Sequence, residues 1–270
     1  MVHVLGNSTD MQALLSLLED HQILLIEDTC ESLGSTYEGR SLGTLGEFGT
    51  YSFYFSHHMT IIEGGMVVAR TAEDNDLLRC LRAHGWSREQ SNKNQLEREN
   101  PQIDPRFLFV NSGYNLRPME IQAAFGLEQL TRLEGMNQQR RANAALMRDI
   151  FLQHPKWKGQ LEFPMAGRNL NACWFGFPFL LAKDANVDRN RFTELLMHAG
   201  IDTRPIVSGN MALQPAVKLF DVDQSLGPFR GAQQIHDRGV FVGVHAKPIT
   251  RDRIEWLADT VLDAVGKASR

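Results

Sequence analysis

The hydrophobic pattern changes its period several times along the chain. Apolar residues recur at helical spacing over Met11–Leu18, and a continuous apolar run, Ile23–Ile26, follows. Such a run is typical of a parallel strand that is covered on both faces. Met1–Leu5 is also predicted to be a strand, so the chain starts with a βαβ unit. Ligands bind beyond the carboxyl ends of parallel strands, which makes Asp28 a candidate for chemistry.

The pattern then predicts further elements in an αβ order. The expected strands are Thr50–Phe55, Met66–Ala69, Cys173–Leu181, Asp202–Val207 and Val240–Val244. The expected helices are Glu73–Arg82, Pro118–Leu133, Met136–Gln153, Asp188–Ala199, Gly231–Arg238 and a last one from Thr250. Gly135 is expected to separate the helix Pro118–Leu133 from the one that follows it. The buried stripe of Pro118–Leu133 is expected to be Ile121, Ala124, Phe125, Leu127, Leu130 and Leu133. Ser87–Pro105 is polar and is expected to be an exposed loop.

Composition narrows the class of protein. The chain has 270 residues, 43% of them hydrophobic and 22% charged, with a formal net charge of −4, as in an ordinary globular protein. This charge does not favour nucleic acid or an anionic membrane as a partner. The three cysteines are widely spaced, which argues for a reducing, cytoplasmic setting and against a disulfide framework or a metal motif. The basic cluster Arg140, Arg141 and Arg148 is expected to form a solvated helix face.

The residues next to the predicted strand ends offer chemistry, each with a plainer alternative. Asp28 suits a pairing with a protonated ring nitrogen, or it is a solvated carboxylate. His57 and His58 are adjacent, so on a strand they point to opposite faces and do not form one metal site. Histidine suits acid–base work because its pKa lies near neutrality. Phe53–Phe55 is expected to be core.

Long blocks of the sequence resemble one known family. The run IEDTCESLGSTYEGRSLGTLGEFGTYSFYFSHHMTIIEGGMVV, with LRAHGWSR and NSGYNLRPMEIQAAFGLEQL, resembles the DegT/DnrJ/EryC1/StrS sugar aminotransferases and dehydratases, which are fold-type I vitamin B6 enzymes. The resemblance implies an α/β fold with a mostly parallel-sheet large domain, residues 1–135, and a connector helix with a small C-terminal α/β domain, residues 136–270. It also implies pyridoxal 5′-phosphate or pyridoxamine 5′-phosphate as the cofactor.

One position sets the chemistry that the resemblance implies. Aminotransferase members carry a lysine that forms a Schiff base with the cofactor, where this sequence has His57. The replacement is similar to that in the 3-dehydratases of nucleotide-linked 4-keto-6-deoxyhexoses, which use pyridoxamine phosphate and a histidine base. Their reaction is a C3 dehydration in deoxysugar and lipopolysaccharide O-antigen biosynthesis. No cysteine lies between Arg88 and Arg106, which favours the GDP-sugar type, regenerated by glutamate, over the CDP-sugar type with its [2Fe–2S] cluster.

The resemblance also assigns roles to matching positions. His57 is the expected catalytic base. The expected cofactor-binding residues are Asp28 at the pyridine nitrogen, Glu31 near the ring, Ser52 at the phosphate and Asn115 at the phosphate of a partner subunit's cofactor. The expected substrate-binding residues are Ser56, His84, Arg88, Arg204 and Asn210. From position alone, Ser52 could instead satisfy a strand end, Asn115 a turn and His84 a helix end.

Other functions stay open at this point. They are a [2Fe–2S]-dependent CDP-sugar dehydrase, a nucleotide-sugar aminotransferase, and an inactive fragment or interaction subunit that pairs with an intact homologue. The resemblance implies a homodimer with shared active sites. Family members begin much earlier, with the helix N-terminus that holds the cofactor phosphate. We therefore expect this chain to lack the N-terminal portion of the large domain.

Overall fold

The computed structural model describes residues 1–223, 225 and 227–269, which form two compact units. The first unit contains Met1–Val2, Met11–Cys30 and Arg40–Leu133. The second contains His3–Asp10, Glu31–Gly39 and the chain from Glu134 onward. The described helices are α1 Met11–Asp20, α2 Ala72–Leu81, α3 Lys93–Glu99, α4 Glu120–Gln153, α5 Arg189–His198, α6 Arg230–Arg238 and α7 Arg251–Ala268. The strands are β1 Ile26–Asp28, β2 Thr36–Tyr37, β3 Arg40–Ser41, β4 Phe48–Ser52, β5 Gly65–Ala69, β6 Leu161–Glu162, β7 Leu170–Asn171, β8 Gly176–Leu181, β9 Thr203–Arg204 and β10 Gly239–Gly243.

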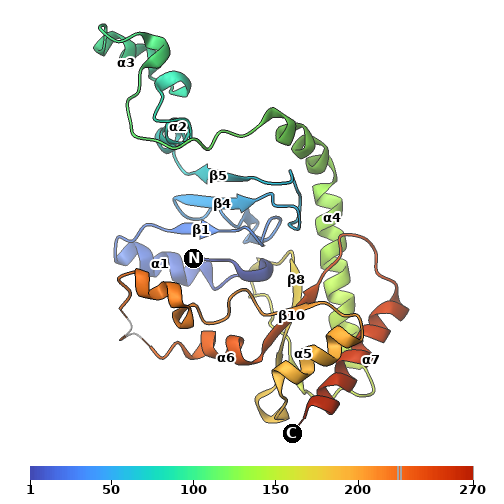
Figure 1. The fold of residues 1–270 in the computed structure, drawn as a ribbon. Helices are drawn as coiled ribbons and strands as arrows, with labels where there is room; N and C mark the ends of the chain where they lie inside the picture. The colour runs from blue at the N-terminus through green and yellow to red at the C-terminus, as the bar shows by residue number, and fades with distance from the viewer. Residues whose placement is uncertain (224, 226, 270) are drawn as a thin grey trace. The chain divides into compact units, whose positions relative to one another are not determined.

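A three-stranded sheet, in the order β1-β4-β5, forms the centre of the first unit (Figure 1). Strand β1 pairs in parallel with β4, so that Asp28 lies opposite Thr50. Strand β5 runs antiparallel to β4 and places Gly65 opposite Ser52. Burial alternates along β4, with Gly49 and Tyr51 turned inward. The parallel pairing brings the carboxyl ends of β1 and β4 to the same edge of the sheet, where Asp28 and Ser52, two of the predicted cofactor residues, lie.

The second unit is built on a four-stranded antiparallel sheet, in the order β6-β8-β10-β9. The apolar run of β8 pairs with β10 from Gly176 opposite Gly243 to Leu180 opposite Gly239. The core of this unit joins the strands to α5, α7 and the second half of α4, and its largest fully buried side chains include Phe151, Phe179, Phe192 and Leu196. Asp188 accepts hydrogen bonds from two backbone N–H groups at the start of α5, which explains why that helix begins there.

The expected elements are confirmed in most places and wrong in a few. Helices α2, α5, α6 and α7 and strands β5 and β10 lie where the pattern predicts them. The prediction of a strand over Met1–Leu5 is wrong, because this segment forms a single bridge at Val2 and a 3₁₀ turn, Val4–Gly6. Strand β1 starts only at Ile26, and Ser87–Pro105 contains the helix α3.

The helix predicted to end at Gly135 continues without a break. Figure 1 shows α4 as one continuous helix, and it has 34 residues. The predicted buried stripe on its first half is wrong as well, since Leu127 is 70% exposed and Ile121, Phe125 and Leu130 are also exposed. A helical period shows which side chains share a face, but it does not show what covers that face.

Two further burial expectations are wrong. Phe55 is 64% exposed and Tyr54 is also exposed, so Phe53–Phe55 is not core. Arg140 is only 8% exposed, because its guanidinium group turns inward and donates to the carbonyl oxygen of Val244 at 2.6 Å. Among the described residues, no helix combines the length and the apolar character that crossing a membrane requires.

Candidate functional site

The first part of the site lies where β1 and β4 end. Asp28 is half-buried, and its Oδ1 atom accepts a hydrogen bond from the backbone N–H of Cys30 at 3.1 Å. Its Oδ2 atom has no hydrogen bond with any residue that the structure describes. Ser52, the last residue of β4, accepts a hydrogen bond from the Tyr54 N–H at 3.2 Å, which leaves its own hydroxyl proton available. The two strand ends therefore present one acceptor and one donor.

His57 lies in the turn that follows β4. Its backbone N–H donates to the carbonyl oxygen of Tyr54 at 3.0 Å, and its ring meets the Tyr54 ring edge-on, with centroids 5.8 Å apart. The half-buried imidazole hydrogen-bonds with the backbone of Ser52 and Cys30 and experiences the charge of Asp28. The predicted base and two predicted cofactor residues thus come together in one place.

The environment of His57 sets its protonation state. Burial lowers the pKa of the imidazole below its usual 6.5, although the hydrogen bonds with Ser52 and Cys30 and the negative charge of Asp28 act in the opposite direction. Burial is the largest of these effects. The imidazole is therefore neutral at pH 7, which is the state that accepts a proton.

Glu27 is a residue that the sequence reasoning missed. It lies next to Asp28 on β1 and is fully buried. Its carboxylate accepts hydrogen bonds from the backbone N–H groups of Gly43 at 2.8 Å, Leu45 at 2.6 Å and Gly46 at 2.7 Å. The sequence feature that could have identified Glu27 is a second acidic residue at the end of an apolar strand. Glu27 fixes the loop before β4 and so the position of the strand end that carries Asp28.

A second cluster contains His84, Arg88 and Asn115. His84 has a left-handed backbone, with φ +65°, and its N–H donates to the Tyr114 carbonyl oxygen at 2.7 Å. Its ring lies edge-on to that of Trp86, with centroids 6.1 Å apart. Asn115 is exposed and its Oδ1 atom accepts a hydrogen bond from the Arg117 Nε atom at 3.1 Å.

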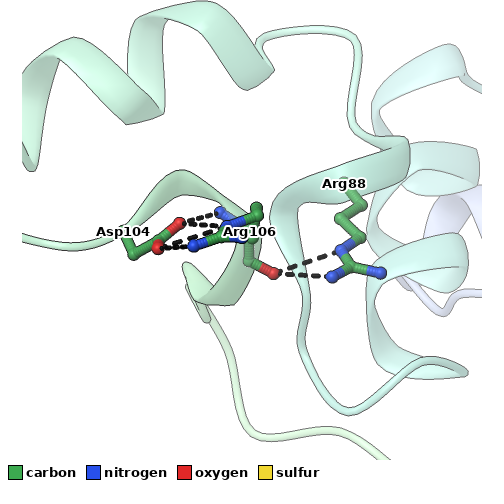
Figure 2. A network of polar contacts seen from close by, with 3 residues as sticks. All are labelled: Arg88, Asp104 and Arg106. Carbon is green, nitrogen blue, oxygen red and sulfur yellow. Dashed lines mark hydrogen bonds and ion pairs between the residues drawn. The ribbon is translucent and has the colours of Figure 1, made fainter.

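Figure 2 shows how Arg88 is held in this cluster. Its guanidinium group donates twice to the backbone carbonyl oxygen of Arg106, at 3.2 and 2.8 Å, and lies 3.6 Å from the centre of the Trp86 ring. Arg106 in turn forms an ion pair with Asp104 at 2.7 Å. Arg88 therefore has a defined position through backbone and cation–π contacts, and Trp86 is a further residue that the sequence reasoning missed.

The remaining predicted residues are placed differently. Ser56 is exposed in the turn before His57. Glu31, Arg204 and Asn210 belong to the second unit. Glu31 accepts the Leu5 N–H at 2.9 Å, and Arg204 is exposed, 3.9 Å from Asp202. Asn210 is buried, accepts the Ala212 N–H at 3.1 Å and donates to Gln233 at 2.9 Å.

Two of these residues lie near a cleft in the second unit. A cavity of about 440 Å³ is lined by Arg204 itself, by Ser208 and Gly209 just before Asn210, and by Arg189 and His236. Its side chains are mostly polar or basic. The Arg189 Nε atom donates to the Gly239 carbonyl oxygen at 3.0 Å, and burial lowers the pKa of that guanidinium group.

Together, the fold and the strand-end site define a protein of the aminotransferase fold. The DegT/DnrJ/EryC1/StrS aminotransferase family matches residues 1–261. The chain belongs to this family. The family resemblance drawn from the sequence blocks is therefore confirmed, as is the α/β fold of the fold-type I kind.

Named relatives are similar over most of the chain. The GDP-4-keto-6-deoxy-D-mannose 3-dehydratase of Yersinia pseudotuberculosis is 38% identical over 248 residues, which cover 90% of this chain and 61% of that protein. The E. coli GDP-4-keto-6-deoxy-D-mannose-3-dehydratase with bound hydrated PLP superposes with a TM-score of 0.86 at 36% identity, covering 96% of this chain and 66% of the other. A GDP-4-keto-6-deoxymannose-3-dehydratase with a trapped PLP-glutamate geminal diamine gives 0.86 at 35% identity, with the same coverage. The chain thus spans less than two thirds of these relatives.

Proposed function

We propose that the chain performs, as part of a nucleotide-sugar 3-dehydratase, the C3 dehydration of a nucleotide-linked 4-keto-6-deoxyhexose. The observation that carries this proposal is His57, a half-buried imidazole beside Asp28 and Ser52 at the position where family aminotransferases carry lysine. Similarity to the GDP-4-keto-6-deoxy-D-mannose 3-dehydratases of Yersinia pseudotuberculosis and E. coli supports it. The expected biological setting is deoxysugar and lipopolysaccharide biosynthesis.

The strand-end residues suit pyridoxal or pyridoxamine phosphate. The free Oδ2 atom of Asp28 matches a protonated pyridine nitrogen, and the Ser52 hydroxyl matches a phosphate oxygen. In this proposal the first unit, including residues 11–30 and 40–133, is the cofactor-binding part. Glu31 is proposed to lie near the ring, with a second role in holding the Leu5 backbone.

His57 has a defined task in this reaction. When bound, pyridoxamine phosphate supplies the amino group that attaches to the C4 carbon of the sugar, and its ring withdraws electrons from the neighbouring bonds. The neutral imidazole of His57 would serve as the base for a proton on the cofactor's methylene carbon. As the imidazolium it would give a proton to the C3 hydroxyl group, which would leave as water. The Asp28 charge supports the protonated state of the ring in between.

Other residues are proposed to bind the substrate. The proposed contacts are Ser56, His84, Arg88, Arg204 and Asn210. The Arg88 guanidinium group is already oriented by Trp86 and Arg106, which lowers the cost of ordering it on binding. Glutamate is the proposed amino donor, in line with the PLP-glutamate adduct of the related structure.

We also propose a homodimer in which Asn115 reaches the cofactor phosphate of the partner subunit. Apolar side chains on the first half of α4 support an interface, because Ile121, Phe125, Leu127 and Leu130 are all exposed. A cytoplasmic location is part of the same proposal, and it is supported by the three cysteines, which form no disulfide within the described part of the chain.

Replacement of His57 tests the proposed reaction. His57→Asn is expected to abolish dehydration of GDP-4-keto-6-deoxymannose while pyridoxamine phosphate still binds, as measured by product analysis and by absorption of the protein-bound cofactor. His245→Asn, at an exposed position in the second unit, is the matched control and is expected to keep activity. Retained dehydration in His57→Asn would overturn the proposal, as would a wild-type chain that binds no cofactor.

A further inference from the structure

The described residues that line one cleft on the second unit include two arginines and no acidic residue. The cleft lies beside the second half of α4 and has a volume of about 250 Å³. Its lining residues are Arg141, Ala144, Ala145, Arg148, Phe163, Pro164, Met165, Ala166, Asn171, Ala172, Trp174, Phe177 and Pro178. None of the residues proposed above for catalysis or for binding the sugar lines this cleft, so it is a separate feature.

The two arginines have unused hydrogen-bond donors. Arg141 and Arg148 are seven residues apart on α4, which places them two turns apart on the same face. Within the described part of the chain, Arg148 makes no hydrogen bond or ion pair, and its buried Nε atom has no acceptor. Arg141 donates to the Gly34 carbonyl oxygen at 2.5 Å, while its Nε atom is buried without an acceptor. Buried N–H donors of this kind favour an added acceptor, and guanidinium groups select carboxylates and phosphates.

The walls of the cleft are aromatic and fixed by packing. Phe163 lies 5.3 Å from Phe177 and stacks on Trp157 at 5.2 Å, measured between ring centroids. Trp174 adds a large aromatic side chain to the lining. Between the two arginines, α4 carries Ala144 and Ala145, whose small side chains leave space open. This combination of aromatic walls and two cationic side chains suits a planar ring that bears a negative charge.

We propose that this cleft binds a small aromatic anion, a single ring with a phosphate or carboxylate group, held by Arg141 and Arg148. Its volume suits a ligand smaller than the drug-sized molecules whose pockets measure roughly 300–1,000 Å³, and it does not enclose a whole nucleotide sugar. This proposal does not depend on the proposed dehydratase reaction, so an experiment can overturn either proposal and leave the other unaffected.

Binding of phenyl phosphate and benzoate to the full chain tests the proposal. Tryptophan fluorescence is the readout, and Trp174→Phe identifies the reporting residue. The wild-type chain is expected to bind at least one probe saturably, and inorganic phosphate more weakly. Ala145→Leu fills the mouth of the cleft from an exposed helix position, and Arg148→Gln removes one cation. Each is expected to weaken binding by about tenfold or more, Arg148→Gln because one charged hydrogen bond is lost and Ala145→Leu because the larger side chain occupies space that the ligand needs.

Matched variants separate this site from others. Ala142→Leu adds the same bulk on an exposed position of α4 outside the cleft and is expected to leave the affinity unchanged. Ser52→Ala is also expected to leave it unchanged, because Ser52 belongs to the proposed cofactor site. Circular dichroism verifies that each variant is folded. Unaltered binding in folded Ala145→Leu and Arg148→Gln would overturn the proposal, as would loss of binding in Ser52→Ala alone or no saturable binding to the wild type. The stronger of the two probes shows whether phosphate or carboxylate is preferred.

Discussion

Inside the first unit, the Glu27 carboxylate accepts a hydrogen bond from the backbone N–H of Leu45 at 2.6 Å. The same carboxylate receives the N–H groups of Gly43 and Gly46, so one buried side chain satisfies three donors of a single loop. Gly49 on β4 packs directly against Gly43, where a Cβ atom would lie 1.9 Å from the Gly43 carbonyl oxygen. The loop, the strand and the end of β1 are therefore fixed together, and Asp28 is presented from a rigid base.

Glu27→Gln is expected to destabilise the chain by about 2–4 kcal/mol, because an amide NH₂ group replaces an acceptor oxygen and meets backbone donors in a fully buried site. Chemical denaturation measures this change. Glu47→Gln is the matched control, since Glu47 forms a partly exposed ion pair with Arg70 and is expected to cost less than about 1 kcal/mol. Equal effects of the two substitutions would contradict the role given to Glu27.

His57 is expected to titrate below pH 6.5, because burial disfavours its charged form. NMR of the imidazole protons measures the midpoint. The Asp28 charge raises the pKa of His57, so Asp28→Asn is expected to move the midpoint to a still lower pH. An upward shift in that variant would show that the carboxylate of Asp28 does not act on the ring.

The same pKa shift has a consequence for stability. The folded-state pKa of His57 lies below its unfolded value, so the unfolded chain binds more protons in the interval between them. The stabilising contribution is therefore present above about pH 6.5 and is lost as the pH falls through the lowered pKa. His57→Asn is expected to flatten this part of the stability profile, as measured by denaturation at several pH values.

Much of the secondary structure follows from local sequence pattern. Which face of each helix is buried by other parts of the protein does not. Helix α5 has its N-cap at Asp188 and an apolar period, and both signals are local to the sequence. The exposure of Leu127 and the burial of Arg140 depend on what packs against each face of α4. A helical period alone does not contain that information.

The candidate site likewise contains residues that the sequence identifies and residues that only the structure identifies. Asp28 and His57 are recognised because a strand end and a family pattern mark them, and in the structure the charge of Asp28 acts on the His57 imidazole. Glu27 is missed because its role rests on backbone N–H groups 16 to 19 residues further along the chain. Trp86 is missed because the sequence does not show that the Arg88 guanidinium group lies over its ring. Contacts between distant segments are tertiary properties that single-sequence patterns do not report.

Asn143 on α4 is expected to be important for the stability of the second unit. Its Nδ2 atom donates to the carbonyl oxygens of His245 and Lys247, both at 2.8 Å, and its side chain is buried. Asn143→Ala leaves these carbonyl groups without their donor and is expected to cost about 2–3 kcal/mol in the free energy of unfolding. Gln138→Ala, at an exposed position of the same helix, is expected to change it by less than about 0.5 kcal/mol.

Gly135 lies within α4, where the sequence pattern predicts a helix end. The residue is exposed, and a Cβ atom there would have no other atom within 4 Å. Gly135→Ala is therefore expected to stabilise the chain by about 0.5–1 kcal/mol, because alanine restricts the unfolded chain more than glycine and favours helix. Gly49→Ala is the opposite case, since its Cβ atom would collide with the Gly43 backbone, and it is expected to destabilise strongly. Thermal unfolding of the two variants measures both effects, and a destabilised Gly135→Ala would show that α4 is broken at Gly135 in solution.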